Sequence, residues 1–231
     1  PGFWQVARNI GCTIMNNHHH ADDSTLLAHA AGALPEGLSL VLAAHLETCH
    51  RCRERVADAE QLGGSMLSEL SPDDIPADSL EHIWERINTP ESQKTENQPV
   101  INVAGLPAVL AKDFPDGLDS IPWRRVAPGI RQFIFNRVSS ERGSVRLFSI
   151  APGTTIPHHS HGGTELTLVL RGSFSDEIGR FGPGDLADLD DSVSHQPVAD
   201  TNEPCICLIA TDERLRFTGM FSRLFQPLVG L

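Results

Sequence analysis

Hydrophobic residues in the first third of the chain recur every three or four positions, which is the spacing of an amphipathic helix. Short helices are predicted at residues 24–32 and 35–46, because a capping serine, a glycine stop and a proline start fall at their ends. A third helix is predicted at about 53–64, where two glycines end it, and a fourth at 79–87. The fourth has one strongly apolar face, formed by Leu80, Ile83, Trp84 and Ile87.

The helical pattern stops at residues 88–99, whose sequence NTPESQKTENQP contains no apolar side chain to bury. This composition predicts a flexible linker and a domain boundary. Beyond it, short β-type runs such as SVRLFSI and CICLIA are separated by Gly and Pro turns, a pattern typical of a sandwich or barrel. We therefore expect an α+β multidomain chain with a small N-terminal α-helical bundle and a C-terminal all-β barrel.

The chain divides into four expected segments. An extension of unknown role covers 1–14, a helical domain 15–88, a linker 89–100 and a β-barrel domain 101–231. Met15 is the expected start of the natural sequence, because the residues before it lack an initiator Met and look unlike the rest.

Composition and charge narrow the functional classes. The net charge of −12 at pH 7 would repel nucleic acid and anionic membrane surfaces, so direct binding to either is not expected. No apolar run approaches the roughly 18 residues of a membrane span, and no secretory signal is visible, so a cytoplasmic protein is expected. Five cysteines, an odd number, favour metal or redox roles over a disulfide framework.

The segment HLETCHRC contains the first candidate metal site. His45, Cys49 and Cys52 stand at i, i+4 and i+7, so around a helix end they can face one side. Two thiolates and an imidazole supply three corners of a tetrahedral Zn²⁺ site, and the run His18–His20 supplies candidates for the fourth. The alternative is that His45, Cys49 and Cys52 are ordinary helix residues that bind no metal, and that the histidine run is unstructured.

The stretch from His20 to Cys52 resembles the zinc-binding anti-sigma domain, in which a histidine precedes an H-x-x-x-C-x-x-C motif; His20 lies 25 residues before His45. The resemblance implies that His20, His45, Cys49 and Cys52 hold Zn²⁺ and that the bundle binds a group IV sigma factor. Residues 15–88 contain 13 Asp and Glu against 4 Arg and no Lys, and such an acidic module complements a basic partner.

A second candidate site lies in GTTIPHHSHGGTELTLVLRG, which resembles the first cupin motif, and a PGD turn followed by His195 resembles a shortened second motif. On a strand, His159 and His161 project from one face, and Glu165 can follow after a turn. Three imidazoles and a carboxylate suit Zn²⁺ or another divalent transition metal such as Mn, Fe or Ni. The alternative is a pocket that is empty or differently ligated.

Two further cysteines fall on one face of a predicted strand. Cys205 and Cys207 stand at i and i+2, where they could form a redox sensor near the metal. Packing in the core is the favoured interpretation, because free cysteine is among the most buried residue types and a reactive thiol needs exposure and a lowered pKa.

The order of these parts resembles the ChrR-type anti-sigma factors from His20 to the C-terminus. The resemblance implies a regulator without catalytic residues, which inhibits a sigma factor and releases it when the cupin domain senses singlet oxygen or organic hydroperoxide. We also expect substitutions of the cupin ligands to leave the N-terminal zinc ligands untouched, because the linker separates the two units.

Two other functional classes are open. One is a metal-dependent cupin enzyme of the dioxygenase or isomerase type with a zinc-binding helical accessory module, since an open coordination site can activate O₂ or water. The other is a protein that stores or senses metal. Co-purification of a sigma factor supports the regulator, whereas oxygen uptake with a small substrate supports the enzyme.

Overall fold

A computed structural model describes residues 17–89, 105–136, 138, 143–213 and 216–217. The expected extension at 1–14, Met15, and all of the expected linker except Thr89 lie outside the described residues.

Four helices precede the β-structure, as the hydrophobic period predicts. They are α1 Asp23–Ala30, α2 Glu36–Leu46, α3 His50–Ser68 and α4 Ser79–Asn88. The predicted end of the third helix was wrong, because α3 continues through Gly63 and Gly64 for one more turn. Neither glycine adopts the positive φ that ends a helix, and the flanking Leu and Met residues are good helix formers that offset a cost of about 1 kcal/mol per glycine.

The C-terminal part is all-β after two short helical turns, α5 Ala108–Ala111 and η3 Leu118–Ser120. A six-stranded antiparallel sheet has the order β1-β2-β3-β11-β5-β8. Its strands are β1 Arg124–Ala127, β2 Ile130–Ile134, β3 Ser144–Ile150, β5 Glu165–Arg171, β8 Leu186–Leu189 and β11 Cys205–Thr211.

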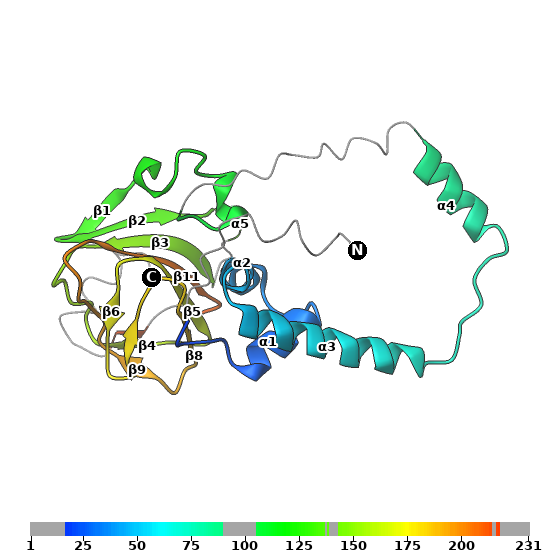
Figure 1. Ribbon diagram of the computed structural model, residues 1–231, viewed down its shortest axis with the longest axis horizontal. Helices are drawn as coiled ribbons and strands as arrows, with labels where there is room; N and C mark the ends of the chain where they lie inside the picture. The colour runs from blue at the N-terminus through cyan, green and yellow to red at the C-terminus, as the bar shows by residue number, and fades with distance from the viewer. Residues whose placement is uncertain (1–16, 90–104, 137, 139–142, 214–215, 218–231) are drawn as a thin grey trace, which may run out of the picture.

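Two small sheets close the other side of the barrel (Figure 1). One has the order β10-β6-β7 and the other β12-β4-β9. Their strands are β4 His159–Ser160, β6 Phe174–Ser175, β7 Arg180–Phe181, β9 Ser194–His195, β10 Val198–Ala199 and β12 Arg216–Phe217. The expected fold class, a helical N-terminal region followed by a β-barrel, is confirmed.

Alternate residues of β11 face two different cores, as the two-residue period of a strand requires. Ile206 and Leu208 belong to a core shared with the helices. Cys205 and Cys207 belong to the core inside the barrel, where they pack with aromatic side chains such as Phe148. The large sheet is therefore covered on both faces.

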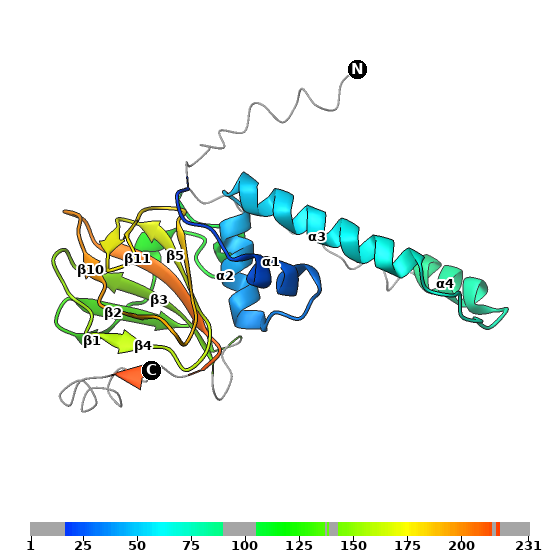
Figure 2. The same ribbon diagram turned by 90° about the horizontal axis from the view of Figure 1, so that it is seen from below.

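Helix α2 covers the outer face of the large sheet, over β5 and β11 (Figures 1 and 2). Its Leu38, Val41 and Leu42 are buried, and each stabilises the fold by about 1.5–3 kcal/mol. Gly37 allows the close approach, because a Cβ there would lie 2.7 Å from Cγ2 of Val145. The helices and the barrel thus share one core, so the expectation that the two units are structurally separate was wrong. The polar composition of residues 88–99 predicts a linker, but it does not indicate which surface α2 packs against.

Candidate metal centres

Two helix ends and one extended segment bring the N-terminal ligand set together. His45 lies in the last turn of α2, Cys49 is the N-cap of α3, and Cys52 lies in the first turn of α3. His20 lies just before α1. One ligand atom from each of these four residues lies within 4.8 Å of the other three. The helical spacing of the motif therefore places its side chains as the sequence predicts.

The separations between these atoms match a tetrahedral zinc site. His20 Nδ1 lies 3.2 Å from Cys49 Sγ and 3.7 Å from Cys52 Sγ. His45 Nε2 lies 3.3 Å from Cys52 Sγ. Zinc bonds of about 2.0–2.3 Å at tetrahedral angles place neighbouring ligand atoms about 3.5 Å apart, so the donor set fits Zn²⁺ without rearrangement.

Of the histidine run that offered a fourth ligand, His20 is the one that the structure brings to the cysteines. The backbone N–H groups of His18 and His19 donate to the carboxylate of Asp185. The His19 ring lies 4.1 Å from that of Phe181, centroid to centroid, and its Nε2 lies 3.1 Å from the carbonyl oxygen of Arg180. These contacts turn His19 toward the barrel and away from the thiols.

The second nitrogen of His45 is fixed by the barrel. His45 Nδ1 donates to the carbonyl oxygen of Gly184 over 2.9 Å, which leaves Nε2 free to bind a metal. Histidines that bind metals usually donate their other ring N–H in this way, which sets the tautomer and the ring orientation. Gly184 is 139 residues from His45, and local spacing in the sequence gives no sign of the contact.

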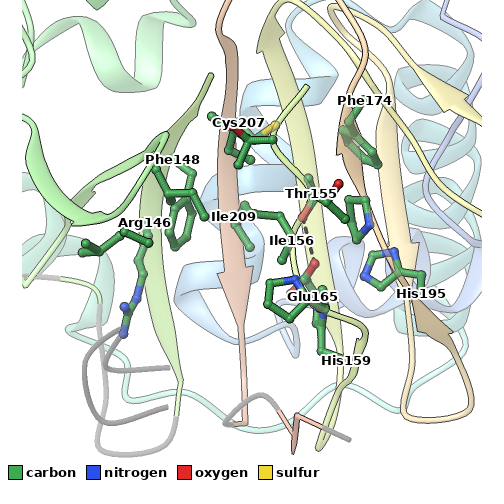
Figure 3. Close-up of a pocket in the computed structure, with 18 of the residues that line it drawn as sticks. Arg146, Phe148, Thr155, Ile156, His159, Glu165, Phe174, His195, Cys207 and Ile209 are labelled. Carbon is green, nitrogen blue, oxygen red and sulfur yellow. Dashed lines mark hydrogen bonds between the residues drawn. The ribbon is translucent and has the colours of Figure 1, made fainter. Parts of the chain in front are cut away.

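The second site lies inside the barrel. His159 on β4 pairs directly with His195 on β9, and His161 follows β4. One ring nitrogen from each histidine lies within 4.8 Å of the others. Glu165 begins β5, with its Oε2 3.3 Å from His161 Nδ1. Figure 3 shows His159, Glu165 and His195 pointing toward one another at one end of a cavity. The structure thus gathers all four residues that the motif predicts.

The chemistry of this cluster fits a bound cation. Nε2 of His161 and Nε2 of His195 are buried with no hydrogen-bond partner in the part of the chain that the structure describes. Burial would raise the pKa of Glu165, but its hydrogen bond and charge interactions with the histidines lower it to about 2. Burial lowers the pKa of His159 to about 4. Burial would lower the pKa of His161, but its contact with Glu165 raises it, so a divalent metal competes with a proton there. A neutral His159 and an ionised Glu165 are already in the forms that bind such a metal.

One supporting residue was missed from the sequence. Oδ2 of Asp176, a fully buried side chain, accepts a hydrogen bond of 2.7 Å from His195 Nδ1. The carbonyl of Pro157 accepts from His159 Nδ1 over 2.9 Å in the same manner. Asp176 follows β6 and lies 19 residues before His195, so only the fold brings the two together.

Comparisons with known proteins show the family to which this chain belongs. A family model described as the ChrR cupin-like domain matches residues 116–213. The anti-sigma-E factor ChrR of Cereibacter sphaeroides is 38% identical over 213 residues, which cover 92% of this chain and 98% of that protein. This chain belongs to the ChrR family of anti-sigma factors.

A solved ChrR structure has the same fold. The crystal structure of Rhodobacter sphaeroides SigE in complex with the anti-sigma ChrR matches with a TM-score of 0.73 and 38% identity, over 85% of this chain and all of that one. An anti-sigma factor is a regulator, so the expectation that this chain is not an enzyme is confirmed at the level of the family. In addition, no helix within the described residues is long and apolar enough to cross a membrane.

In this member of the ChrR family the cupin site opens onto an apolar cavity of about 330 Å³ (Figure 3). Phe148, Phe174 and Ile209 line it, and Cys207 lies on its wall. Cys205 Sγ lies 3.4 Å from Cys207 Sγ, and both side chains are buried. The contact with Cys205 and burial raise the pKa of Cys207, which disfavours a reactive thiolate and supports the interpretation of the pair as core residues.

Zinc affinity at the N-terminal centre is expected to rise with pH. Burial raises the pKa of Cys52 to about 11 and lowers the pKa of His45 to about 4. At neutral pH the thiol therefore still holds a proton that zinc must displace, whereas the imidazole is already neutral. Each displaced proton raises the apparent affinity about tenfold per pH unit. Chelator competition at several pH values around neutrality measures this slope, and an affinity independent of pH would contradict it.

Proposed function

We propose that this ChrR-family protein binds and inhibits a group IV sigma factor in the cytoplasm and releases it under oxidative stress sensed through the cupin domain. In this proposal, residues 15–88 hold the sigma factor and residues 101–231 sense singlet oxygen or organic hydroperoxide, with 89–100 as the linker. His20, His45, Cys49 and Cys52 hold structural Zn²⁺. A second ligand set, which binds Zn²⁺ or another divalent transition metal, consists of His159, His161, Glu165 and His195.

The observation that carries the proposal is an exposed apolar surface on the two distal helical segments. The second half of α3 and the whole of α4 extend away from the barrel (Figures 1 and 2). Their large apolar side chains are all more than half exposed. They are Leu62, Met66 and Leu67 on α3 and Leu80, Ile83, Trp84 and Ile87 on α4.

An apolar stripe of this kind is typical of a helix that docks into a partner's groove. On α4 the stripe follows i, i+3, i+4 and i+7, and none of the helix is buried in the free chain. The surrounding module is acidic, which suits a partner with basic surfaces and speeds their encounter. The solved relative, ChrR, is described in complex with SigE, and a sigma factor is therefore the partner that we propose for this surface.

The direct test is inhibition of a purified sigma factor. The full chain should co-elute with a group IV sigma factor in size-exclusion chromatography and should suppress promoter-specific transcription by polymerase carrying that factor. Oxygen uptake by the metal-loaded protein with small organic substrates, without any effect on transcription, would instead overturn the proposal.

Trp84→Asp is expected to weaken sigma binding strongly without changing the fold. The Trp84 side chain is 54% exposed, so the substitution disturbs no core, yet it places a charge in the centre of the apolar stripe. Loss of a central aromatic anchor costs about 2 kcal/mol or more, roughly 30-fold in Kd. Binding is measured by calorimetry or fluorescence anisotropy with purified sigma factor.

The matched control is His82→Asp, which places the same carboxylate on the opposite face of α4. Its side chain is exposed, and its Nε2 lies 3.8 Å from Oδ2 of Asp78. His82→Asp should bind nearly as tightly as the unaltered chain. Equal weakening by both variants would show that charge, rather than the apolar stripe, governs the interaction.

A further inference from the structure

We infer that the β7–β8 turn of the cupin is a structural part of the N-terminal metal centre. Gly184 and Asp185 position His45 and His20, so the centre is fully ordered only while the barrel is docked beside it. This inference rests on the proposed zinc site. It means that residues of the cupin domain position the ligands of the N-terminal zinc, although none of the cupin residues binds that zinc.

Asp185 holds the segment that carries His20. Its carboxylate is 4% exposed, and its Oδ1 accepts from the backbone N–H of His18 over 2.7 Å and of His19 over 3.1 Å. Its Oδ2 accepts from the N–H of Gly182 over 2.9 Å, which closes the turn around it. A buried carboxylate that receives three backbone N–H groups is a strong, charge-assisted anchor. The backbone just before His20 is thereby fixed to the barrel.

The same segment runs along strand β8. The N–H of Leu186 donates to the carbonyl of His19 over 3.3 Å, and Asp188 Oδ2 accepts from the N–H of Asp22 over 2.9 Å. His20 therefore lies between two anchors, one on each side along the chain, and both belong to β8. A ligand at the edge of the helical module is held in this way at a defined distance from the thiols.

Gly184 acts on the second histidine. Its carbonyl oxygen accepts from His45 Nδ1, and its own N–H donates to the carbonyl of Val169 on β5 over 2.8 Å. The turn is therefore anchored on the large sheet while it orients the His45 ring. Gly184 has a φ of +89°, which side-chain-bearing residues rarely adopt, so the turn depends on glycine at this position.

These contacts differ from ordinary docking contacts between two units. They are polar, and they end on the distal ring nitrogen of His45 and on the backbone on either side of His20. The contact of His45 is buried, and those of Asp185 with the segment before His20 are partly buried. A turn that served only to dock the helices would affect stability but not the properties of the bound metal. A positioning role predicts altered coordination and faster metal loss in a folded protein.

The test uses the full chain with Asp185→Ala and Asp185→Asn, loaded with Zn²⁺ or with Co²⁺. Thiolate-to-cobalt charge transfer reports only the N-terminal centre, because the cupin ligands include no cysteine. Asp185→Ala should shift the cobalt spectrum and release metal from this centre about 10- to 100-fold faster to a chelator, the range expected for loss of an outer-shell partner. Metal in the cupin site and the circular dichroism spectrum should be unchanged.

Asp185→Asn gives a graded result, because its amide oxygen can still accept from His18 and His19 while the contact to Gly182 is lost. Its rate of metal release should fall between those of the unaltered chain and Asp185→Ala. If Asp185→Ala fails to fold, the release rate of Asp185→Asn tests the inference instead. The control is Asp200→Ala, which removes another barrel carboxylate, one bonded to Ser175 and Arg180 and not to residues 18–22.

The outcomes separate the inference from the proposed zinc site. If the unaltered chain takes up cobalt without thiolate charge transfer, the zinc assignment itself is wrong. If the unaltered chain shows the band and both Asp185 variants match it in spectrum and release rate, only the inference is overturned. If Asp200→Ala changes release as much as Asp185→Ala does, the effect is general loosening of the barrel and the inference is likewise overturned.

Discussion

Cys52→Ser is expected to remove zinc from the N-terminal centre and to weaken sigma-factor binding by about 100-fold or more, equivalent to about 2.7 kcal/mol. The Cys52 thiol is fully buried and lies within 3.7 Å of ligand atoms on both His20 and His45, so its loss removes one corner of the site. Structural zinc contributes about 10–16 kcal/mol in small zinc modules, far more than one helix turn provides. Without it, the first turn of α3 loses its anchor.

The expected result is specific to the N-terminal centre. Elemental analysis of Cys52→Ser should show the loss of one metal while the cupin metal stays, and the large sheet should remain folded because its inner core is separate. His50→Ala, which removes an exposed imidazole from the same turn of the chain, serves as the control and should keep both metals and full binding. Tight sigma binding by a Cys52→Ser protein that contains no zinc would refute a structural role for the metal.

Glu165→Gln and His195→Ala are expected to produce a repressor that binds its sigma factor but fails to release it. Each removes one donor from the buried cupin cluster, and loss of a ligand should weaken metal binding at least as much as the 10- to 100-fold cost of losing an outer-shell partner. If the metal-bound cupin initiates release, the state that loosens the complex is then not reached. A reporter of the sigma regulon, with and without singlet oxygen or organic hydroperoxide, measures the response.

The structure adds a requirement to this experiment. Glu165 pairs in register with Leu189, at the end of the same strand β8 whose start supports the zinc centre. Zinc at the N-terminal centre must therefore be measured in each cupin variant and not assumed to be intact. Glu203→Gln, an exposed carboxyl on the loop before β11, is the matched control and should induce normally. Normal induction in Glu165→Gln with proven loss of the cupin metal would show that the metal has no part in release.

The grouping of the candidate ligands could be predicted from the sequence because their patterns are local. His45, Cys49 and Cys52 follow the period of a helix, and His159 and His161 follow that of a strand, so each set lies together whatever the rest of the chain does. His20 needed a resemblance to a known family, since the histidine run alone left three candidates.

The supporting residues could not be predicted in the same way. The contact between His45 and Gly184 spans 139 residues, and no spacing rule applies to it. The docking of α2 was missed for a related reason: its apolar face predicts that the helix is buried, but not by which surface. Such features depend on tertiary contacts, which hydrophobic periodicity does not encode.

The length of α3 gives small movements at its base a large effect. Its 19 residues form one continuous rod that starts at the thiols. At about 1.5 Å per residue the rod is about 28 Å long, so a tilt of about 10° at its base carries its tip through about 5 Å. Apolar side chains are in contact only within about 4.5 Å, so a displacement of that size is enough to separate two surfaces. The base of α3 is the point where the candidate zinc ligands, residues 18–22 and the β7–β8 turn meet, so a small rotation there would move the apolar surface at its far end out of contact with a partner.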